Sequence, residues 1–211
     1  MGKSGVGLCI KLRASLHNNA GGVKCDFYRR DIGASAGYAT RMTLETIEIE
    51  TAPNPDAAVI WLHGLGADGH DFEPMVPELV HRGERAWRFV FPHATPRPVS
   101  INGGMRMRAW YDIIGFDRKA KEDEAGFRET DEAIRRLIAK EVARGIAPGR
   151  IVLAGFSQGG AVSLYTAPRY PERLAGVMAL STYLPMADRL DALRAHANDG
   201  LPIFMAHGLD D

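Results

Sequence analysis

A glycine–serine–glycine motif, set between an apolar run and a run of small residues, constrains this chain more than any other feature. Residues 151–161 read IVLAGFSQGGA, in which Gly155, Ser157 and Gly159 follow the spacing Gly-x-Ser-x-Gly. A serine on a sharp strand-to-helix turn needs small residues two positions away, because side chains there would clash with the turn. Such a turn exposes the serine hydroxyl and leaves the Gln158 backbone N–H at a helix N-terminus, where it can stabilise an oxyanion. The pattern predicts a nucleophile elbow with Ser157 as the nucleophile.

Composition narrows the classes of protein to which this elbow can belong. The chain has 211 residues, 45% hydrophobic and 25% charged, which suits one α/β domain with a sizeable core. A net charge of zero gives no support for nucleic-acid binding, and no apolar run is long enough to span a bilayer. Both cysteines, Cys9 and Cys25, lie near the N-terminus, so we expect no disulfide framework in the main body and a cytoplasmic setting.

Residues 1–41 differ in character from the rest of the chain. They contain seven basic and two acidic residues and show no sustained periodicity. A transit-type leader would be rich in arginine and poor in acids, as this segment is. We favour a simpler interpretation, a disordered or mis-started N-terminal extension, because an ordinary strand pattern begins directly after it. The sequence thus predicts an N-terminal extension at 1–41 and a folded domain at 42–211.

Strand and helix patterns alternate along residues 42–211. Alternating apolar residues predict a half-exposed strand at 43–50, and a continuous apolar run predicts a strand buried on both faces at 57–62. Further strands are expected at 86–91, 151–156, 174–180 and 202–206, and helices at 72–81, 121–145, 158–167 and 188–197. This order predicts a mostly parallel sheet with helices on both faces, whose ligands gather beyond the carboxyl ends of the strands.

The loop after the 57–62 strand reads HGLGADGHD and carries two histidines, His63 and His70. In hydrolases of this architecture that loop supplies the second oxyanion N–H, which we assign to Leu65. Either histidine would suit a catalytic base by residue type. We favour a structural role for both, in which an imidazole holds the loop in place by hydrogen bonding.

Two further loops carry apolar residues suited to an acyl site. Residues 92–109 are rich in proline and glycine and are expected to form a long loop, which in a compact domain is usually functional or disordered. Met107 and Trp110 near its far end are candidates for substrate binding, although either residue could simply pack the loop down. Tyr183 and Leu184, in the loop after the 174–180 strand, are the other two candidates for substrate binding.

Six stretches together resemble the phospholipase/carboxylesterase family of α/β-hydrolases, which includes bacterial carboxylesterases and acyl-protein thioesterases. They occur in the family's order and read VIWLHGLGADG (59–69), PHATPRPV (92–99), MRAWYD (107–112), GFSQGGA (155–161), LSTYLP (180–185) and HGLDD (207–211). The resemblance implies Ser157 as nucleophile and Leu65 and Gln158 as oxyanion donors. It also implies Asp211 as the triad acid, because the family's His-Gly-x-x-Asp spacing ends there.

The same resemblance implies that residues 42–211 are an incomplete α/β-hydrolase domain, whose histidine base, last strand and last helix would lie a few tens of residues beyond Asp211. We therefore expect a serine carboxylic-ester hydrolase of carboxylesterase or acyl-thioesterase type, acting on a small ester or thioester without metal or cofactor. Without its base, this chain is expected to be nearly inactive. The alternative is a non-catalytic acyl-binding or interaction module on a hydrolase scaffold. An uncovered sheet edge would also favour self-association.

Overall fold

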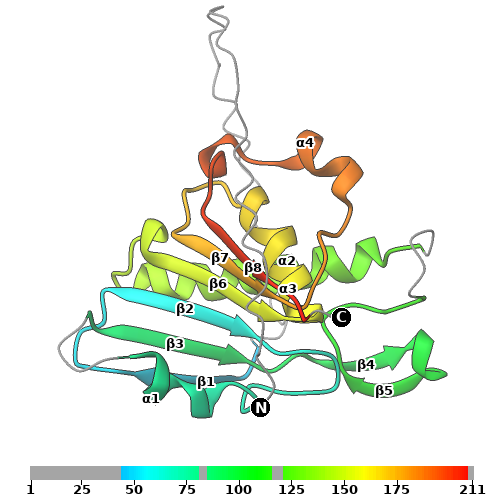
Figure 1. Ribbon diagram of the computed structural model, residues 1–211, viewed down its shortest axis with the longest axis horizontal. Coiled ribbons are helices and arrows are strands. Elements are labelled where there is room, and N and C mark those ends of the chain that lie inside the picture. The colour runs from blue at the N-terminus through cyan, green and yellow to red at the C-terminus, as the bar shows by residue number, and fades with distance from the viewer. Residues whose placement is uncertain (1–43, 81–84, 116–120, 209–211) are drawn as a thin grey trace, which may run out of the picture.

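A six-stranded sheet organises the computed structural model, which describes residues 44–80, 85–115 and 121–208 (Figure 1). The strand order is β1-β3-β2-β6-β7-β8, and β1 is antiparallel to β3 while the other pairs are parallel. The strands are β1 (Thr46–Glu50), β2 (Ala57–Leu62), β3 (Trp87–Pro92), β6 (Ile151–Phe156), β7 (Gly176–Leu180) and β8 (Ile203–Ala206). The mostly parallel sheet predicted from the alternating patterns is confirmed.

Apolar side chains pack on both faces of this sheet, as the uninterrupted apolar run of β2 predicts. On one face Ile60 and Leu153 pack with α2 (Glu124–Ala143) and α3 (Gln158–Thr166). On the other face Trp61 packs with Phe89, Phe91 and the short helix α1 (Val76–Leu79). The register pairs Ile60 of β2 with Leu153 of β6, so the two central strands contribute to the same core. The predicted coverage of both faces is therefore confirmed.

The expected loop at 92–109 is wrong in its secondary structure. β4 (Pro96–Val99) and β5 (Met105–Arg108) form an antiparallel hairpin that is separate from the main sheet. These strands pair only with each other in the described part of the chain, and most of their residues are exposed or half-buried. The hairpin thus contributes little to the core, and the prolines of β4 argue against a strand in the sequence.

Three helix predictions also need correction. The segment 72–81 forms a 3₁₀ turn at Glu73–Met75 followed by one α-helical turn, and 188–197 contains only the four-residue helix α4 (Leu190–Leu193). The long helix is confirmed as α2, but it spans Glu124–Ala143 rather than 121–145. No described helix is long and apolar enough to cross a membrane. The extension predicted at 1–41 lies outside the described residues.

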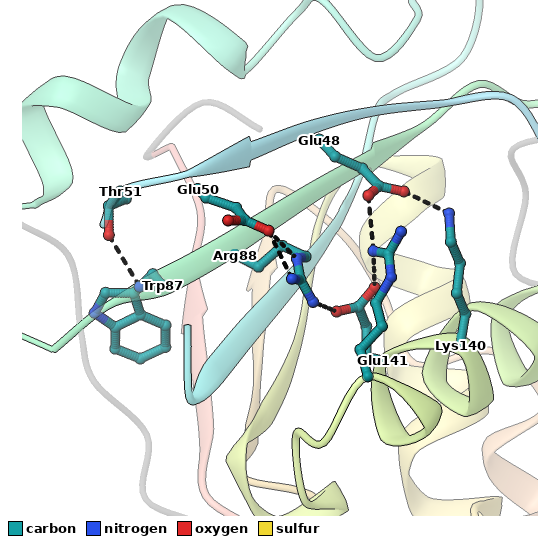
Figure 2. Close-up of polar contacts among 8 residues, drawn as sticks. Glu48, Glu50, Thr51, Trp87, Arg88, Lys140 and Glu141 are labelled. Atoms are coloured by element: carbon teal, nitrogen blue, oxygen red, sulfur yellow. Dashed lines mark hydrogen bonds and ion pairs between the residues drawn. The ribbon is translucent and has the colours of Figure 1, made fainter. Parts of the chain in front are cut away.

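An alternating chain of charges joins β1 and β3 to α2 (Figure 2). Its members, in order of contact, are Lys140, Glu48, Arg144, Glu141, Arg88 and Glu50. The Glu141 side chain is only 1% exposed, and Arg88 and Arg144 each donate to it at 2.9 Å. A buried carboxylate requires such partners, because leaving it unpaired costs several kcal/mol. Glu141 thereby attaches the edge of the sheet to α2.

This network predicts a pH-dependent contribution to stability. Burial opposes ionisation of Glu48, but hydrogen bonds from Lys140, Arg144 and Thr46 outweigh it and lower the pKa of Glu48 to about 2. Ionised Glu48 therefore stabilises the fold above its unfolded pKa of 4.5, and this stability is lost as the pH falls from 4.5 towards 2. Because Glu48 is partly solvated, we expect the contribution to be about 1–2 kcal/mol.

The Glu48→Gln variant isolates this contribution. Its free energy of unfolding, measured in urea, should fall below that of the parent chain at neutral pH, and the difference should shrink as the pH approaches about 3. Glu78→Gln is the matched control, since Glu78 is exposed and belongs to none of these ion pairs. A difference between parent and Glu48→Gln that stays constant with pH would contradict the role of Glu48.

Candidate active site

Ser157 lies on a strained turn between β6 and α3. Its backbone has φ 52° and ψ −117°, a left-handed conformation that is rare for a residue with a side chain. The turn is held from the neighbouring strand, because Ser157 N–H donates to Leu180 O at 2.8 Å and Thr182 Oγ1 donates to Ser157 O at 2.6 Å. The nucleophile elbow expected from the sequence thus has the backbone geometry that exposes a serine hydroxyl.

Close backbone approach explains the two glycines of the Gly-x-Ser-x-Gly motif. A Cβ on Gly155 would lie 2.2 Å from the carbonyl carbon of Gly159, and a Cβ on Gly159 would lie 2.4 Å from Leu62 O. Side-chain carbons do not approach backbone atoms so closely. Strand β6, the start of α3 and the end of β2 therefore come together only if both positions lack a side chain.

The loop after β2 passes beside Ser157. A Cβ on Gly64 would lie 3.7 Å from Ser157 Cβ, which places the start of this loop against the nucleophile. The backbone N–H groups of Leu65 and Gln158 donate to no partner among the described residues, so both are available to a bound group. Gln158 is also the first residue of α3, where the helix dipole favours negative charge. These are the two donors that the sequence predicts for an oxyanion hole.

The Gln158 side chain holds neighbouring segments together, a role that the sequence pattern did not predict. Its Oε1 accepts from Trp110 N–H at 2.9 Å, and its Nε2 donates to Tyr111 O at 2.7 Å. Trp110 Nε1 in turn donates to His63 O at 2.8 Å. These buried bonds connect the elbow, residues 110–111 and the loop after β2. In the sequence, the only signals for these bonds are the glutamine that directly follows Ser157 and the adjacent pair Trp110 and Tyr111.

A cavity of about 720 Å³ opens beside the nucleophile. Both Ser157 and Gln158 line it, and Tyr183, Leu184 and Met186 contribute apolar surface. Tyr183 and Leu184 are therefore brought together with Ser157, as a substrate-binding role requires. The aromatic ring of Tyr111 also lines the cavity and stacks on Phe127 of the core, with ring centroids 3.9 Å apart.

Met107 and Trp110, the other two candidates for substrate binding, do not line this cavity. Trp110 is 2% exposed and belongs to the core, so its position favours the packing role over contact with substrate. The Sδ of Met107 accepts from the Asn102 side-chain amide at 3.3 Å. A Cβ on Gly66 would lie 3.8 Å from that sulfur. Both residues therefore support the loop rather than the cavity wall.

Two tyrosine hydroxyls meet at the cavity wall. Tyr111 Oη and Tyr183 Oη are 3.3 Å apart, and either can be the donor. Burial raises the pKa of Tyr111, and the neighbouring Tyr183 hydroxyl and Glu122 carboxylate raise it further. Tyr111 therefore stays a neutral hydroxyl that positions Tyr183 by hydrogen bonding. Nothing in this arrangement favours a tyrosinate nucleophile.

None of the described histidines is hydrogen-bonded to Ser157. The His63 ring is buried, with Nδ1 2.7 Å from Gly64 O and Nε2 accepting from Ala94 N–H at 3.0 Å. Burial lowers the pKa of His63, so the ring is neutral and holds the loop, the role favoured from the sequence. His70 pairs with Glu73, and His207 is exposed just after β8. Asp211, the expected triad acid, lies outside the described residues.

Within the described ranges, no group of three or more His, Cys, Asp or Glu side chains is arranged to hold a metal ion. The groups gathered at the elbow are a serine hydroxyl and backbone N–H donors. A hydroxyl on a strained turn, two N–H groups without partners and an adjacent apolar cavity suit transfer of an acyl group to Ser157.

Comparisons with known proteins agree with this geometry. The family model described as phospholipase/carboxylesterase matches residues 44–211. Acyl-protein thioesterase 1 of Cryptococcus neoformans is 39% identical over 173 residues, covering 80% of this chain and 72% of that protein. The Schizosaccharomyces pombe protein of the same name is 38% identical over 168 residues, covering 80% of this chain and 74% of that protein.

Solved structures show the same relationship in three dimensions. The crystal structure of Arabidopsis thaliana SOBER1 has a TM-score of 0.69 and 31% identity, covering 74% of this chain and 75% of that chain. Zea mays acyl-protein thioesterase 2 has a TM-score of 0.67 and 27% identity, covering 78% and 76%. The family model, the sequence relatives and the shared fold lead to one conclusion: this chain belongs to the phospholipase/carboxylesterase family of α/β-hydrolases.

Proposed function

We propose that this protein hydrolyses carboxylic esters or thioesters through an acyl-enzyme formed on Ser157. The observation that carries the proposal is the strained Ser157 turn, which opens into the 720 Å³ cavity beside two backbone N–H groups without partners. The names of the sequence relatives, acyl-protein thioesterases, support a thioester as one substrate class. An acyl chain would lie against Tyr183, Leu184 and Met186, which line that cavity.

In the proposed reaction, Ser157 Oγ attacks the acyl carbonyl carbon and loses its proton to a base. The carbonyl oxygen becomes an oxyanion, which the N–H groups of Leu65 and Gln158 stabilise. Collapse of the intermediate breaks the bond to the alcohol or thiol, which leaves with a proton. Water then attacks the acyl-serine and returns the enzyme. A histidine as base and Asp211 as its orienting acid are the assignments that the family resemblance implies.

A second candidate, a non-catalytic acyl-binding module, is favoured by one observation. Among the described residues no histidine bonds Ser157, since His63, His70 and His93 are each bound elsewhere. A serine without a base is a poor nucleophile at neutral pH, and an oxyanion hole alone gives about 10³–10⁴ over water. We therefore propose that the 211-residue chain turns over far more slowly than a complete triad would allow.

Reaction with a fluorophosphonate probe separates these two functions. An activated serine is expected to be phosphonylated within minutes, and the Ser157→Ala variant is expected to remain unlabelled. Slow or absent labelling of a folded parent chain would favour the binding module. Labelling that persists in Ser157→Ala at the parent's rate would contradict the proposal, because another residue would then be the nucleophile.

Two wider proposals concern the cell and the assembly. We place the protein in the cytoplasm, since residues 42–211 contain no cysteine for a disulfide framework.

Self-association is supported by β8, which pairs only with β7 in the described part of the chain. Its residues Ile203 and Phe204 are 42% and 53% exposed. Sedimentation of the purified chain as a single monomeric species would contradict self-association.

A further inference from the structure

Two histidines join the loops that follow β2 and β3 in a reciprocal way. In one direction, His63 Nε2 accepts from the backbone N–H of Ala94 at 3.0 Å. In the other, His93 Nδ1 accepts from the backbone N–H of Gly69 at 3.1 Å. Each loop therefore contributes one imidazole acceptor and one backbone donor to a pair of bonds, which we call the histidine cross-tie.

Both bonds require neutral imidazole rings. A ring nitrogen accepts a hydrogen bond only while it carries no proton, and an imidazolium would set an N–H against the backbone N–H. His63 donates from Nδ1 to Gly64 O at 2.7 Å, which leaves Nε2 bare for Ala94. His93 uses Nδ1 as the acceptor, so its single proton is on Nε2. Each ring is thus fixed in one neutral tautomer by its partners.

The cross-tie fixes the loop that carries Leu65 at both of its ends. His63 is the first residue of this loop, and Gly69 lies near its last residue. Gly69 packs so closely on β3 that a Cβ there would lie 2.6 Å from Phe91 O. Between these ends, Gly66 N–H donates to Arg108 O at 2.8 Å. The Leu65 N–H itself has no partner in the described part of the chain, so its position depends on these neighbouring anchors.

We propose that His63 and His93 are positioning residues that hold the Leu65 N–H in the oxyanion hole only while both rings are neutral. Protonation of either ring breaks one bond of the cross-tie and frees that end of the loop. The inference rests on the proposed function for the role of Leu65. The bonds themselves stand independently of that role, so they are tested separately below.

The charged groups around the two rings are known from the structure. Burial of His63 lowers its pKa most, the bond to Gly64 and the Asp68 carboxylate oppose this, and His93 and Arg108 add to it. The His63 ring therefore stays neutral, and keeps its bond to Ala94, at a lower pH than an exposed histidine ring would. Half-buried His93 has the His70 ring beside it, with ring centroids 5.8 Å apart, and the charges of Asp68 and Arg108 nearby. The backbone N–H of His93 donates to the backbone carbonyl of Glu45.

Two substitutions of His93 distinguish loss of the hydrogen-bond acceptor from loss of the titratable proton. His93→Asn keeps an oxygen acceptor near the position of Nδ1 and cannot be protonated, whereas His93→Leu removes the acceptor. His70→Asn is the matched control, because His70 lies on the same loop but its ring bonds Glu73. Amide NMR of the full chain reports the Gly69 and Leu65 N–H groups, and fluorophosphonate labelling reports Ser157.

As the pH is lowered from 8, we expect the Gly69 and Leu65 amide signals of the parent chain and of His70→Asn to titrate, with faster hydrogen exchange at Gly69. In His93→Asn neither signal should show that titration. At pH 8, His93→Leu should label at Ser157 about tenfold more slowly than the parent chain, and His93→Asn should restore the parent rate.

Two results would overturn the inference. One is a Gly69 titration in His93→Asn that matches the parent chain, and the other is parent-like labelling of His93→Leu. If no variant labels at Ser157, the proposed function fails, but the amide titrations still decide whether the cross-tie holds the loop. If Ser157 labels normally while Gly69 and Leu65 do not titrate, the cross-tie fails and the proposed function stands.

Discussion

Replacing Gly159 by alanine is expected to destabilise the fold by about 3 kcal/mol or more. The added Cβ would lie 2.4 Å from Leu62 O and 2.6 Å from His63 O, both backbone atoms at the end of β2. These atoms cannot move aside without disturbing the pairing of Leu62 with Gly155 on β6. Alanine is intrinsically better than glycine in a helix, so any loss of stability comes from the clash.

Urea unfolding followed by tryptophan fluorescence measures this effect. Gly149→Ala is the matched control, because the nearest atom to a Cβ at Gly149 is Arg173 O at 3.7 Å, an ordinary contact. We expect Gly149→Ala to unfold near the parent midpoint and Gly159→Ala far below it, or to be unfolded without denaturant. Equal midpoints for the two variants would show that α3 does not approach β2 as closely as described.

Ser157→Ala is expected to abolish serine-dependent hydrolysis of 4-nitrophenyl butyrate. In a complete triad, loss of the nucleophile costs about 10⁶ in kcat, or about 8 kcal/mol of barrier, and the slower turnover proposed for this chain makes its own loss correspondingly smaller. The residual rate should be that of the oxyanion donors alone, and stability should change by less than about 0.5 kcal/mol. The change in stability is small because the turn is held through the Ser157 backbone, whose N–H bonds Leu180 and whose carbonyl bonds Thr182, and alanine keeps both bonds.

Ser181→Ala is the control for this substitution, since Ser181 lines the same cavity and also has a positive φ of 45°. Initial rates for the two variants and the parent chain, measured with a saturating ester, give the comparison. We expect Ser181→Ala to retain most of the parent rate. Equal losses in both variants would indicate a general disturbance of the cavity and would contradict a specific role for Ser157.

The backbone of the site could be predicted from sequence because it depends on local rules. A turn between an apolar strand and a helix tolerates only small residues around its serine, so Gly155 and Gly159 reveal the elbow. Likewise, β2 is recognisable because a strand buried on both faces is apolar throughout. In each case the residues that determine the structure are neighbours in the chain.

Other features could not be predicted because they depend on contacts between distant residues. The Gln158 side chain bonds Trp110 and Tyr111, which lie 47 or 48 positions away, and no local pattern signals this. Trp110 was a candidate for the cavity by residue type, yet the bond to His63 O holds it in the core. No local pattern marks Glu141 as buried, because its partner Arg88 is 53 positions away.

The histidines show how residue type alone misleads. By type, His63 and His70 both suited a catalytic base, and only the structure shows what each ring contacts. His63 bonds Gly64 O and Ala94 N–H, and His70 bonds Glu73. These partners support the other expectation, that the imidazole of each residue holds the loop in place by hydrogen bonding. The reciprocal bond from Gly69 to His93 was not foreseen, since His93 follows a different strand.

The mass of the protein after brief exposure to 4-nitrophenyl butyrate tests the central claim most directly. The reaction would be stopped with acid and the mass of the intact protein measured. The protein would then be digested to locate any added group. We predict one added butyryl group, carried on the peptide that contains Ser157 and absent from the Ser157→Ala variant. A folded parent chain that gains no butyryl group, or gains it on another residue, would contradict an acyl-enzyme at Ser157.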